Sequence, residues 1–249
     1  MKKNLYFREQ INRQKINHTA LQQFINIASY PRLVLDVFLR KNFGQRYFSL
    51  GDAYFVILVL GIIPLVRPYM ASSYVRFDWG DFFLHYATWY AFLAAYYMFS
   101  VRRENEIKRE LSVFDFGKYS LYSGDIDPRF YRIGGKTDVR KIETLYEPAI
   151  FLAAGIVLYL IRQPIGTVFV VCSLFYSMGS ACAYKLGDDF VMNHIDEMIV
   201  NEELEDTFVN DKQPEDARGV RFYGRKPANA DNRRKLVQTF TEDETVTIK

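Results

Sequence analysis

The chain has 249 residues, of which 49% are hydrophobic and 24% charged, and its formal net charge at pH 7 is +3. This apolar content excludes a wholly disordered chain, and the small net charge excludes the overall basic field that nucleic-acid-binding proteins normally carry. Charged residues lie mostly outside four apolar windows, which excludes a soluble enzyme with one mixed core. We therefore predict an all-α integral membrane protein with four transmembrane helices in two hairpins.

Residues 1–48 form the predicted cytoplasmic N-terminal region. A capping box that starts at Thr19 predicts a helix to about Ser29. Pro31 suits the first turn of a second, amphipathic helix that ends near Asn42. This second helix is expected to lie on the anionic inner leaflet or, alternatively, to pack on cytoplasmic protein. The predicted membrane-surface cations of this region are Arg32, Arg40, Lys41 and Arg46.

Residues 49–100 hold two apolar windows, 50–66 and 82–100, and predict the first transmembrane hairpin. A bilayer core of about 30 Å needs about 20 helical residues, with about 17 as the lower limit. Small residues at four-residue spacing let lipid-embedded helices approach closely. The second window carries such a stripe, formed by Ala87, Ala91 and Ala95. We expect it to pack against another helix of the same chain or of a partner.

Residues 101–147 form the predicted cytoplasmic middle loop. Its two ends are charged and helical in pattern, whereas residues 114–135 are aromatic and interrupted by Gly, Ser, Asp and Pro. This composition is typical of turns and short strands, and predicts a small compact element with little core of its own. Its expected partner-binding residues are Phe114, Phe116, Tyr119, Tyr122, Phe130 and Tyr131.

Residues 148–184 predict the second transmembrane hairpin, with windows 148–161 and 166–184. The first of these windows reaches span length only if residues 144–147 and Arg162 lie in the membrane interface with their polar groups turned outward. The predicted helix-packing residues of this hairpin are Ala149, Ala153, Ser173, Ser177 and Ala181. Residues 185–249 are predicted to be cytoplasmic, with an acidic helix from about 189 to 205 followed by a polar tail.

The distribution of Lys and Arg predicts the orientation. Residues 1–49, 67–81, 101–147, 162–165 and 185–249 carry 9, 2, 10, 1 and 10 of these residues. Cytoplasmic loops carry the excess of positive charge, so both termini and the middle loop are expected in the cytoplasm. The predicted location is therefore the bacterial inner (plasma) membrane, crossed several times.

Two sets of ionisable residues could support chemistry, and each has a simpler structural interpretation. His85 lies within the second window, where an ionisable group is a functional candidate, but no charged residue at the centre of another window completes a relay. Asp188, Asp189 and His194 resemble metal ligands in type, yet on a helix Asp189 and His194 face different sides. The sequence contains no GxxxxGK[ST] phosphate loop and no GxSxG motif. We expect no catalytic residue, no cofactor and no metal.

These observations favour a non-enzymatic scaffold or assembly subunit that presents cytoplasmic segments to a larger complex. Its expected partners are the lipid bilayer, other membrane or cytoplasmic protein subunits, and a second copy of the chain, with no specific nucleic acid. A secretion or conjugation apparatus fits by analogy of layout. One alternative is a small transporter or channel that uses His85, and another is an interfacial membrane enzyme that uses Asp188, Asp189 and His194.

Overall fold

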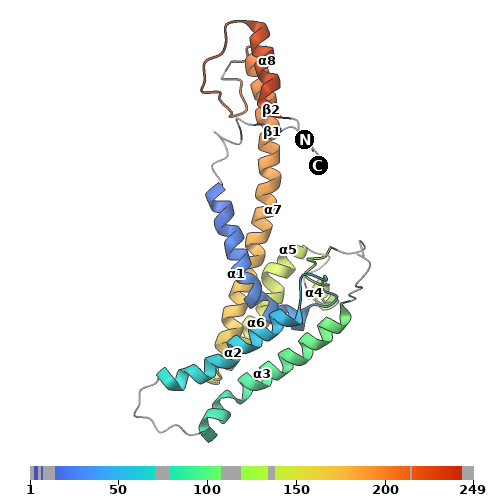
Figure 1. The fold of residues 1–249 in the computed structure, drawn as a ribbon, viewed down its shortest axis with the longest axis vertical. Helices are drawn as coiled ribbons and strands as arrows, with labels where there is room; N and C mark the ends of the chain where they lie inside the picture. Colours follow the sequence, from blue (N-terminus) through green and yellow to red (C-terminus); the bar gives the residue numbers. More distant parts are fainter. Residues whose placement is uncertain are drawn as a thin grey trace. The chain divides into compact units, whose positions relative to one another are not determined.

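The computed structural model describes residues 3–4, 7, 15–70, 79–107, 119–133, 138–213 and 215–242. The chain divides into two compact units, one of residues 23–183 and the other of residues 1–22 with 184–249. The helices of both units appear in Figure 1. They are α1 (Lys15–Leu39), α2 (Leu50–Met70), α3 (Trp79–Glu106), α4 (Pro128–Ile133), α5 (Val139–Lys141), the π-helical turn η2 (Ile142–Tyr146), α6 (Glu147–Leu160), α7 (Ile165–Val209) and α8 (Ala230–Phe240).

The helices confirm the all-α prediction for the described part of the chain. The sheet structure described there is one antiparallel ladder of two-residue strands, β1 (Lys3–Asn4) and β2 (Thr241–Glu242), in which Lys3 pairs with Glu242. Each predicted apolar window lies within a helix, except that Ile161, the last residue of window 148–161, follows the end of α6.

Two helical runs are long and apolar enough to cross a membrane, Val139–Leu160 and Ile165–Val209, and they indicate membrane association. The apolar part of α2, Leu50–Val66, is shorter. Helix α3 is not apolar enough to count as a third such run. Its apolar residues are interspersed with tyrosines, a histidine and a threonine, and its last turns are charged. The length and composition of the described helices thus support two spans rather than the four expected.

Helix α1 differs from its prediction, because it runs unbroken through Pro31 instead of restarting there. Proline removes one backbone hydrogen bond, and packing of the next turns offsets this loss. Leu33, Val34 and Val37 are buried in the main core of the unit. The apolar face of α1 therefore packs on the other helices of the same unit, and not on the inner leaflet of the membrane.

Helix α7 joins two predicted elements, the fourth apolar window and the acidic helix of residues 189–205. The sequence between them contains Gly187 but no proline. A single glycine within a helix costs only about 1 kcal/mol relative to alanine, so the helix continues from the apolar to the acidic segment.

The inward face of α3 is aromatic rather than alanine-rich. Its buried residues recur every three or four positions, and include Tyr86, Trp89, Leu93, Tyr96 and Ser100. The Trp89 indole Nε1 donates a hydrogen bond to the Leu60 carbonyl of α2 at 2.9 Å. Large rings fill the space between α3 and its neighbours, so the small-residue stripe points outward: Ala87 and Ala91 are exposed and Ala95 is half-buried. The structure does not pack Ala87 and Ala91 within the chain, and packing of the stripe against a partner stays a prediction.

Helices α6 and α7 pack closely through hydroxyl groups and glycines. Ser173 Oγ donates a hydrogen bond to the Pro148 carbonyl at 2.5 Å, and Ser177 Oγ donates one to the Thr144 carbonyl at 2.6 Å. Both serines thus lie on the face that contacts α6, as predicted. Their companions in the predicted stripes, Ala149, Ala153 and Ala181, are exposed instead.

The closest approach of α6 and α7 is at Gly166, and we expect Gly166→Ala to destabilise the protein by about 1–3 kcal/mol. A Cβ at this position would lie 2.6 Å from the Gly155 carbonyl oxygen and 2.6 Å from the Tyr159 nitrogen, so backbone would have to move. Thermal unfolding of the detergent-solubilised protein measures the effect. Gly187→Ala is the matched control: no atom lies within 4 Å of its Cβ, and a helical glycine replaced by alanine should gain about 0.5–1 kcal/mol. Equal effects of the two substitutions would contradict this packing.

Candidate functional site

A buried arginine at the end of α1 joins segments that are distant in the sequence. The Arg40 side chain is 1% exposed. Its Nε and Nη2 donate to the two carboxylate oxygens of Glu147 at 3.2 and 2.5 Å, a bidentate pair. Nη2 also donates to Glu143 Oε1 at 2.9 Å, and Nη1 donates to Ser123 Oγ at 2.8 Å. One guanidinium therefore fixes the ends of α1 and α6, the turn η2 and the middle loop.

The π-helical turn explains why both carboxylates reach Arg40. Glu143 belongs to η2, and Glu147 begins α6 directly after it. A π-helix closes hydrogen bonds between residues five apart, so residues four apart lie almost one full turn apart and face the same side. The Tyr176 hydroxyl of α7 donates a further hydrogen bond to Glu147 Oε2 at 2.6 Å.

Asp36 extends the network along α1. It is fully buried and accepts hydrogen bonds at Oδ2 from Arg32 Nε at 3.1 Å and from the Tyr47 hydroxyl at 2.6 Å. Its Oδ1 lies 3.7 Å from Arg40 Nε. The Arg32 guanidinium also lies over the Tyr176 ring, 4.9 Å from its centroid. We call Arg32, Asp36, Arg40, Glu143, Glu147, Tyr47 and Tyr176 the buried ion network.

Burial and neighbouring charges shift the pKa values of two hydrogen-bond donors of the network, Arg40 and Tyr47. Burial alone lowers the pKa of Arg40, but Tyr176 and the carboxylates of Asp36 and Glu147 offset this and raise it above its ordinary value. Burial also raises the pKa of Tyr47, helped by the negative charge of Asp36. Arg40 is therefore a cation and Tyr47 a neutral donor at physiological pH. Buried ions cost desolvation free energy and are tolerated where each keeps its partners, so the network couples the positions of the segments that supply them.

The middle loop also pairs with the chain that follows α1. The Gly44 amide donates to the Tyr122 carbonyl at 2.9 Å, and the Asp125 amide donates to the Lys41 carbonyl at 2.7 Å. Gly124 between them has φ +94°, a conformation that favours glycine. The predicted short strands of the loop are thus single bridges and turns followed by the helix α4.

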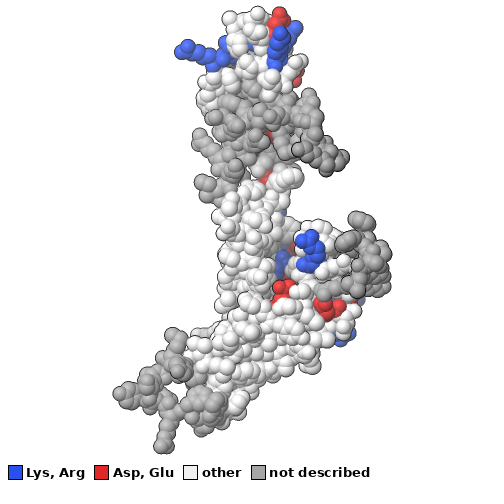
Figure 2. Space-filling view, viewed as in Figure 1, with Lys and Arg blue, Asp and Glu red and all other residues white. Residues whose placement is uncertain are grey.

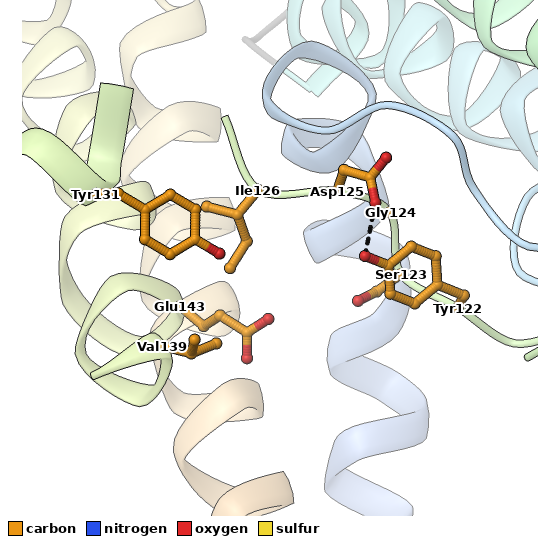
Figure 3. Close-up of a pocket in the computed structure, with 8 residues that line it drawn as sticks. All are labelled: Tyr122, Ser123, Gly124, Asp125, Ile126, Tyr131, Val139 and Glu143. Atoms are coloured by element: carbon orange, nitrogen blue, oxygen red, sulfur yellow. Dashed lines mark hydrogen bonds between the residues drawn. The ribbon is translucent and has the colours of Figure 1, made fainter. Parts of the chain in front are cut away.

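A pocket of about 280 Å³ lies between the middle loop and η2, and its lining is drawn in Figure 3. Glu143, a member of the ion network, forms part of the pocket wall. Tyr122 and Tyr131 lie on opposite sides of the pocket. The Tyr122 hydroxyl donates a hydrogen bond to Asp125 Oδ1 at 2.8 Å. Mainly through burial, and also through this hydrogen bond, the pKa of Tyr122 is raised to about 12. The complete lining is Tyr122, Ser123, Gly124, Asp125, Ile126, Tyr131, Val139 and Glu143.

The lining of this pocket combines hydrogen-bond acceptors with aromatic surface. Carboxylate oxygens accept hydrogen bonds, and phenol rings provide apolar surface with a polar edge. No serine or cysteine paired with a histidine base lines it. Within the described ranges, no group of three or more His, Cys, Asp or Glu side chains is arranged to hold a metal ion.

The predicted partner-binding residues have different positions in the structure. Tyr122 and Tyr131 line the pocket. Tyr119 is 70% exposed, whereas Phe130, a residue of α4, is buried. Phe114 and Phe116 lie outside the described residues.

The predicted membrane-surface cations also separate into two groups. Lys41 and Arg46 are exposed, as expected of surface residues. Arg40 is buried instead, and Arg32 is half-buried over Tyr176. The structure places Arg40 in the interior because Glu147, 107 residues further along the chain, supplies its counter-charge.

The residues of the two alternative functions are not members of the ion network. His85 is exposed and lines a separate hollow of about 470 Å³ with Arg162 and Gln163. His194 stacks on Phe190 of its own helix, with ring centroids 6.3 Å apart. Asp188 and Asp189 lie at successive positions of that same helix, and among the described residues they belong to no group of three or more His, Cys, Asp or Glu side chains that could hold a metal ion.

Most members of the ion network were missed from the sequence. Arg32, Asp36 and Arg40 are spaced four residues apart, with Asp36 inside the apolar run LVLDVFL. This spacing places them on one helix face, so a buried ion pair in α1 could have been inferred. Glu143, Glu147 and Tyr176 had no comparable local signal.

The structure shows a helical protein with two helices long and apolar enough to cross a membrane, and with a buried ion network beside a pocket. No protein-family model, curated protein or solved structure matches the chain. The evidence for its function is therefore the geometry and chemistry of its own residues.

Proposed function

We propose that the chain is a non-enzymatic assembly subunit of the bacterial inner membrane. In this proposal four helices cross the bilayer, and both termini and the middle loop lie in the cytoplasm. The middle loop and the C-terminal helix are then presented to other subunits of a larger complex. A secretion or conjugation apparatus is the kind of host that this layout suits.

The observation that carries the proposal is the apolar outer surface of unit 23–183. Large apolar patches on a protein surface mark membrane or protein contacts, and this one covers the middle turns of several helices. Figure 2 shows charged side chains around α4, α5 and the adjoining end of α3, while the surface over the middle of α2 and α3 is free of them on this face. Its exposed residues include Phe55, Leu58, Ile62, Ile156, Val157, Leu160, Val171, Leu174 and Met178.

The buried ion network supports the same proposal from the polar end of the unit. Arg40 holds Ser123 of the middle loop as well as Glu143 and Glu147, so the loop has a defined position before any partner arrives. A surface that is ordered in advance loses less conformational entropy on binding. The pocket and the exposed Tyr119 beside it thus suit a docking platform.

The transporter or channel remains an alternative because of the hollow at His85. Aromatic rings fill the unit further along the same helices, which does not favour a polar path from that hollow. The Phe92 and Phe169 rings have centroids 5.0 Å apart, and those of Phe151 and Phe169 are 5.5 Å apart. The residues of the membrane-enzyme alternative, Asp188, Asp189 and His194, line neither the pocket beside Glu143 nor the hollow at His85.

Affinity purification from native membranes tests the proposed function. We expect the double substitution Tyr119→Ala/Tyr131→Ala to reduce the amount of co-purified subunits by about tenfold, because exposed tyrosines often dominate interface free energies. The amount of the chain in the membrane fraction should not change. Tyr223→Ala, at a side chain that is 89% exposed, is the control. Retention of all co-purified subunits by the double variant would refute the platform, and a chain that always purifies alone would refute the assembly role.

A further inference from the structure

The acidic part of α7 buries one of its faces in the protein and exposes another. In the unit of residues 1–22 and 184–249, Val200, Leu204 and Phe208 are buried together with Phe7. The side chains on the opposite face are not covered: Val191 is 54%, Ile195 44% and Met198 53% exposed. The helix thus carries an apolar stripe beyond the one that its own core uses.

The open stripe has the spacing of a helix-pairing seam. Positions 191, 195, 198, 202 and 205 alternate steps of four and three residues, which is the repeat of a and d positions in a coiled coil. Val191, Ile195 and Met198 make the first part of this seam apolar. Glu202 and Glu205 make the rest acidic, and both are exposed. We call these five positions the α7 seam.

The charge around the α7 seam is of one sign. Residues 186–211 contain nine Asp and Glu residues and no Lys or Arg. The following segment supplies cations that pair with Glu202, Glu203, Asp206 and Asp211. On the core side, Glu203 accepts hydrogen bonds from Lys212 Nζ at 2.8 Å and from Arg218 Nε at 2.9 Å. Hydrogen bonds from Lys212 and Arg218 lower the pKa of Glu203. Arg218 also pairs with Glu202, at the border of the seam.

These charges decide between the occupants of the α7 seam. A second copy in parallel would place Glu202 and Glu205 beside their own equivalents, and an antiparallel copy would place them against Val191 and Ile195. Both arrangements are unfavourable, because like charges repel and a carboxylate placed against apolar surface loses its hydration. The anionic inner leaflet would repel the same carboxylates.

We propose that the α7 seam binds a basic amphipathic helix of a partner subunit. Apolar side chains of that helix cover Val191, Ile195 and Met198, and its Lys or Arg side chains pair with Glu202 and Glu205. This mode of recognition uses one helix face and regularly spaced anchors. The inference rests on the proposed assembly function and names the chemistry of one partner.

A designed peptide tests the proposal on the full-length protein in non-ionic maltoside micelles. The probe is a fluorescent helical peptide with three seam leucines flanked at each end by two seam lysines, and the comparison peptide has glutamates in place of the lysines. We expect the lysine peptide to bind at least about tenfold more tightly than the glutamate peptide by fluorescence anisotropy, with affinity that falls as salt rises. Equal affinity of the two peptides, or no binding, would overturn the proposal.

Matched variants locate the bound peptide. Ile195→Glu should weaken lysine-peptide binding by about tenfold or more, and Glu202→Gln/Glu205→Gln should reduce both the affinity and its salt dependence. Phe190→Glu and Asp189→Asn change exposed or polar groups away from the seam, and these variants should bind the peptide as the unchanged protein does. Seam variants that bind normally, or a native mass of two copies that Ile195→Glu reduces to one, would overturn the proposal. If the peptide fails to bind while native subunits still co-purify through the middle loop, this inference falls and the assembly function stands.

Discussion

Replacing Arg40 with methionine should lower the free energy of unfolding by about 3–5 kcal/mol, the usual cost of removing one partner from a buried ion pair. Methionine keeps much of the side-chain volume but leaves Glu147 and Glu143 without the guanidinium that donates to both. The middle loop also loses its hydrogen bond from Arg40 to Ser123. In thermal unfolding of the solubilised protein, the midpoint should fall by an amount on the order of 10 °C.

Two comparison variants make this result specific. Arg40→Lys keeps the charge but cannot form the planar bidentate pair with Glu147, so its stability should lie between those of the native protein and of Arg40→Met. Arg102→Met removes an arginine that is 71% exposed and 3.8 Å from Glu106, and should change stability by less than about 1 kcal/mol. The ion network would not have the role described here if Arg40→Met and Arg102→Met had the same effect.

The second large effect concerns the solvent around α7. Leu174 lies near the middle of the apolar part of this helix and is 49% exposed. If lipid covers it, Leu174→Asp places a carboxylate in the hydrocarbon and should oppose insertion by about 2.5–3.5 kcal/mol. We therefore expect a strong loss of membrane-inserted protein, measured by flotation of vesicles after synthesis in their presence.

The same type of substitution in water should have little effect. Tyr223→Asp changes an aromatic residue that is 89% exposed in the other unit, and such surface substitutions are usually within about 0.5 kcal/mol of neutral. It should insert as the native chain does. An inserted fraction of Leu174→Asp equal to that of Tyr223→Asp would show that water, not lipid, surrounds Leu174.

The helices of the membrane-compatible unit were largely predictable because their signal is local. Long runs of apolar residues in the sequence mark α2, α6 and the first half of α7 without any knowledge of the fold. The full lengths of α1 and α7 were not predictable. Pro31 and Gly187 each weaken a helix locally, and packing of the neighbouring turns decides whether the helix continues through them. Leu33 and Val37, buried in the core, supply that packing for α1.

The site was less predictable because its partners are distant in the sequence. Arg40 has the appearance of a surface cation until Glu147 is brought to it by the pairing of α1 with α6. The backbone pairing of Gly44 with Tyr122 likewise joins two segments that carry no recognisable strand pattern. The pocket residues Tyr122 and Tyr131 were selected for their aromatic character alone, and their relation to Glu143 emerged with the fold.

The central claim is that lipid surrounds the apolar outer face of the unit that contains Leu174, and the collision rates of a spin label test it most directly. The label is attached at position 174 of the full chain in vesicles, with Cys172 and Cys182 replaced by alanine. We predict frequent collisions with oxygen, which concentrates in hydrocarbon, and few with a water-soluble nickel chelate. A label at position 174 that meets the nickel chelate as often as a label at position 223 does would contradict the account.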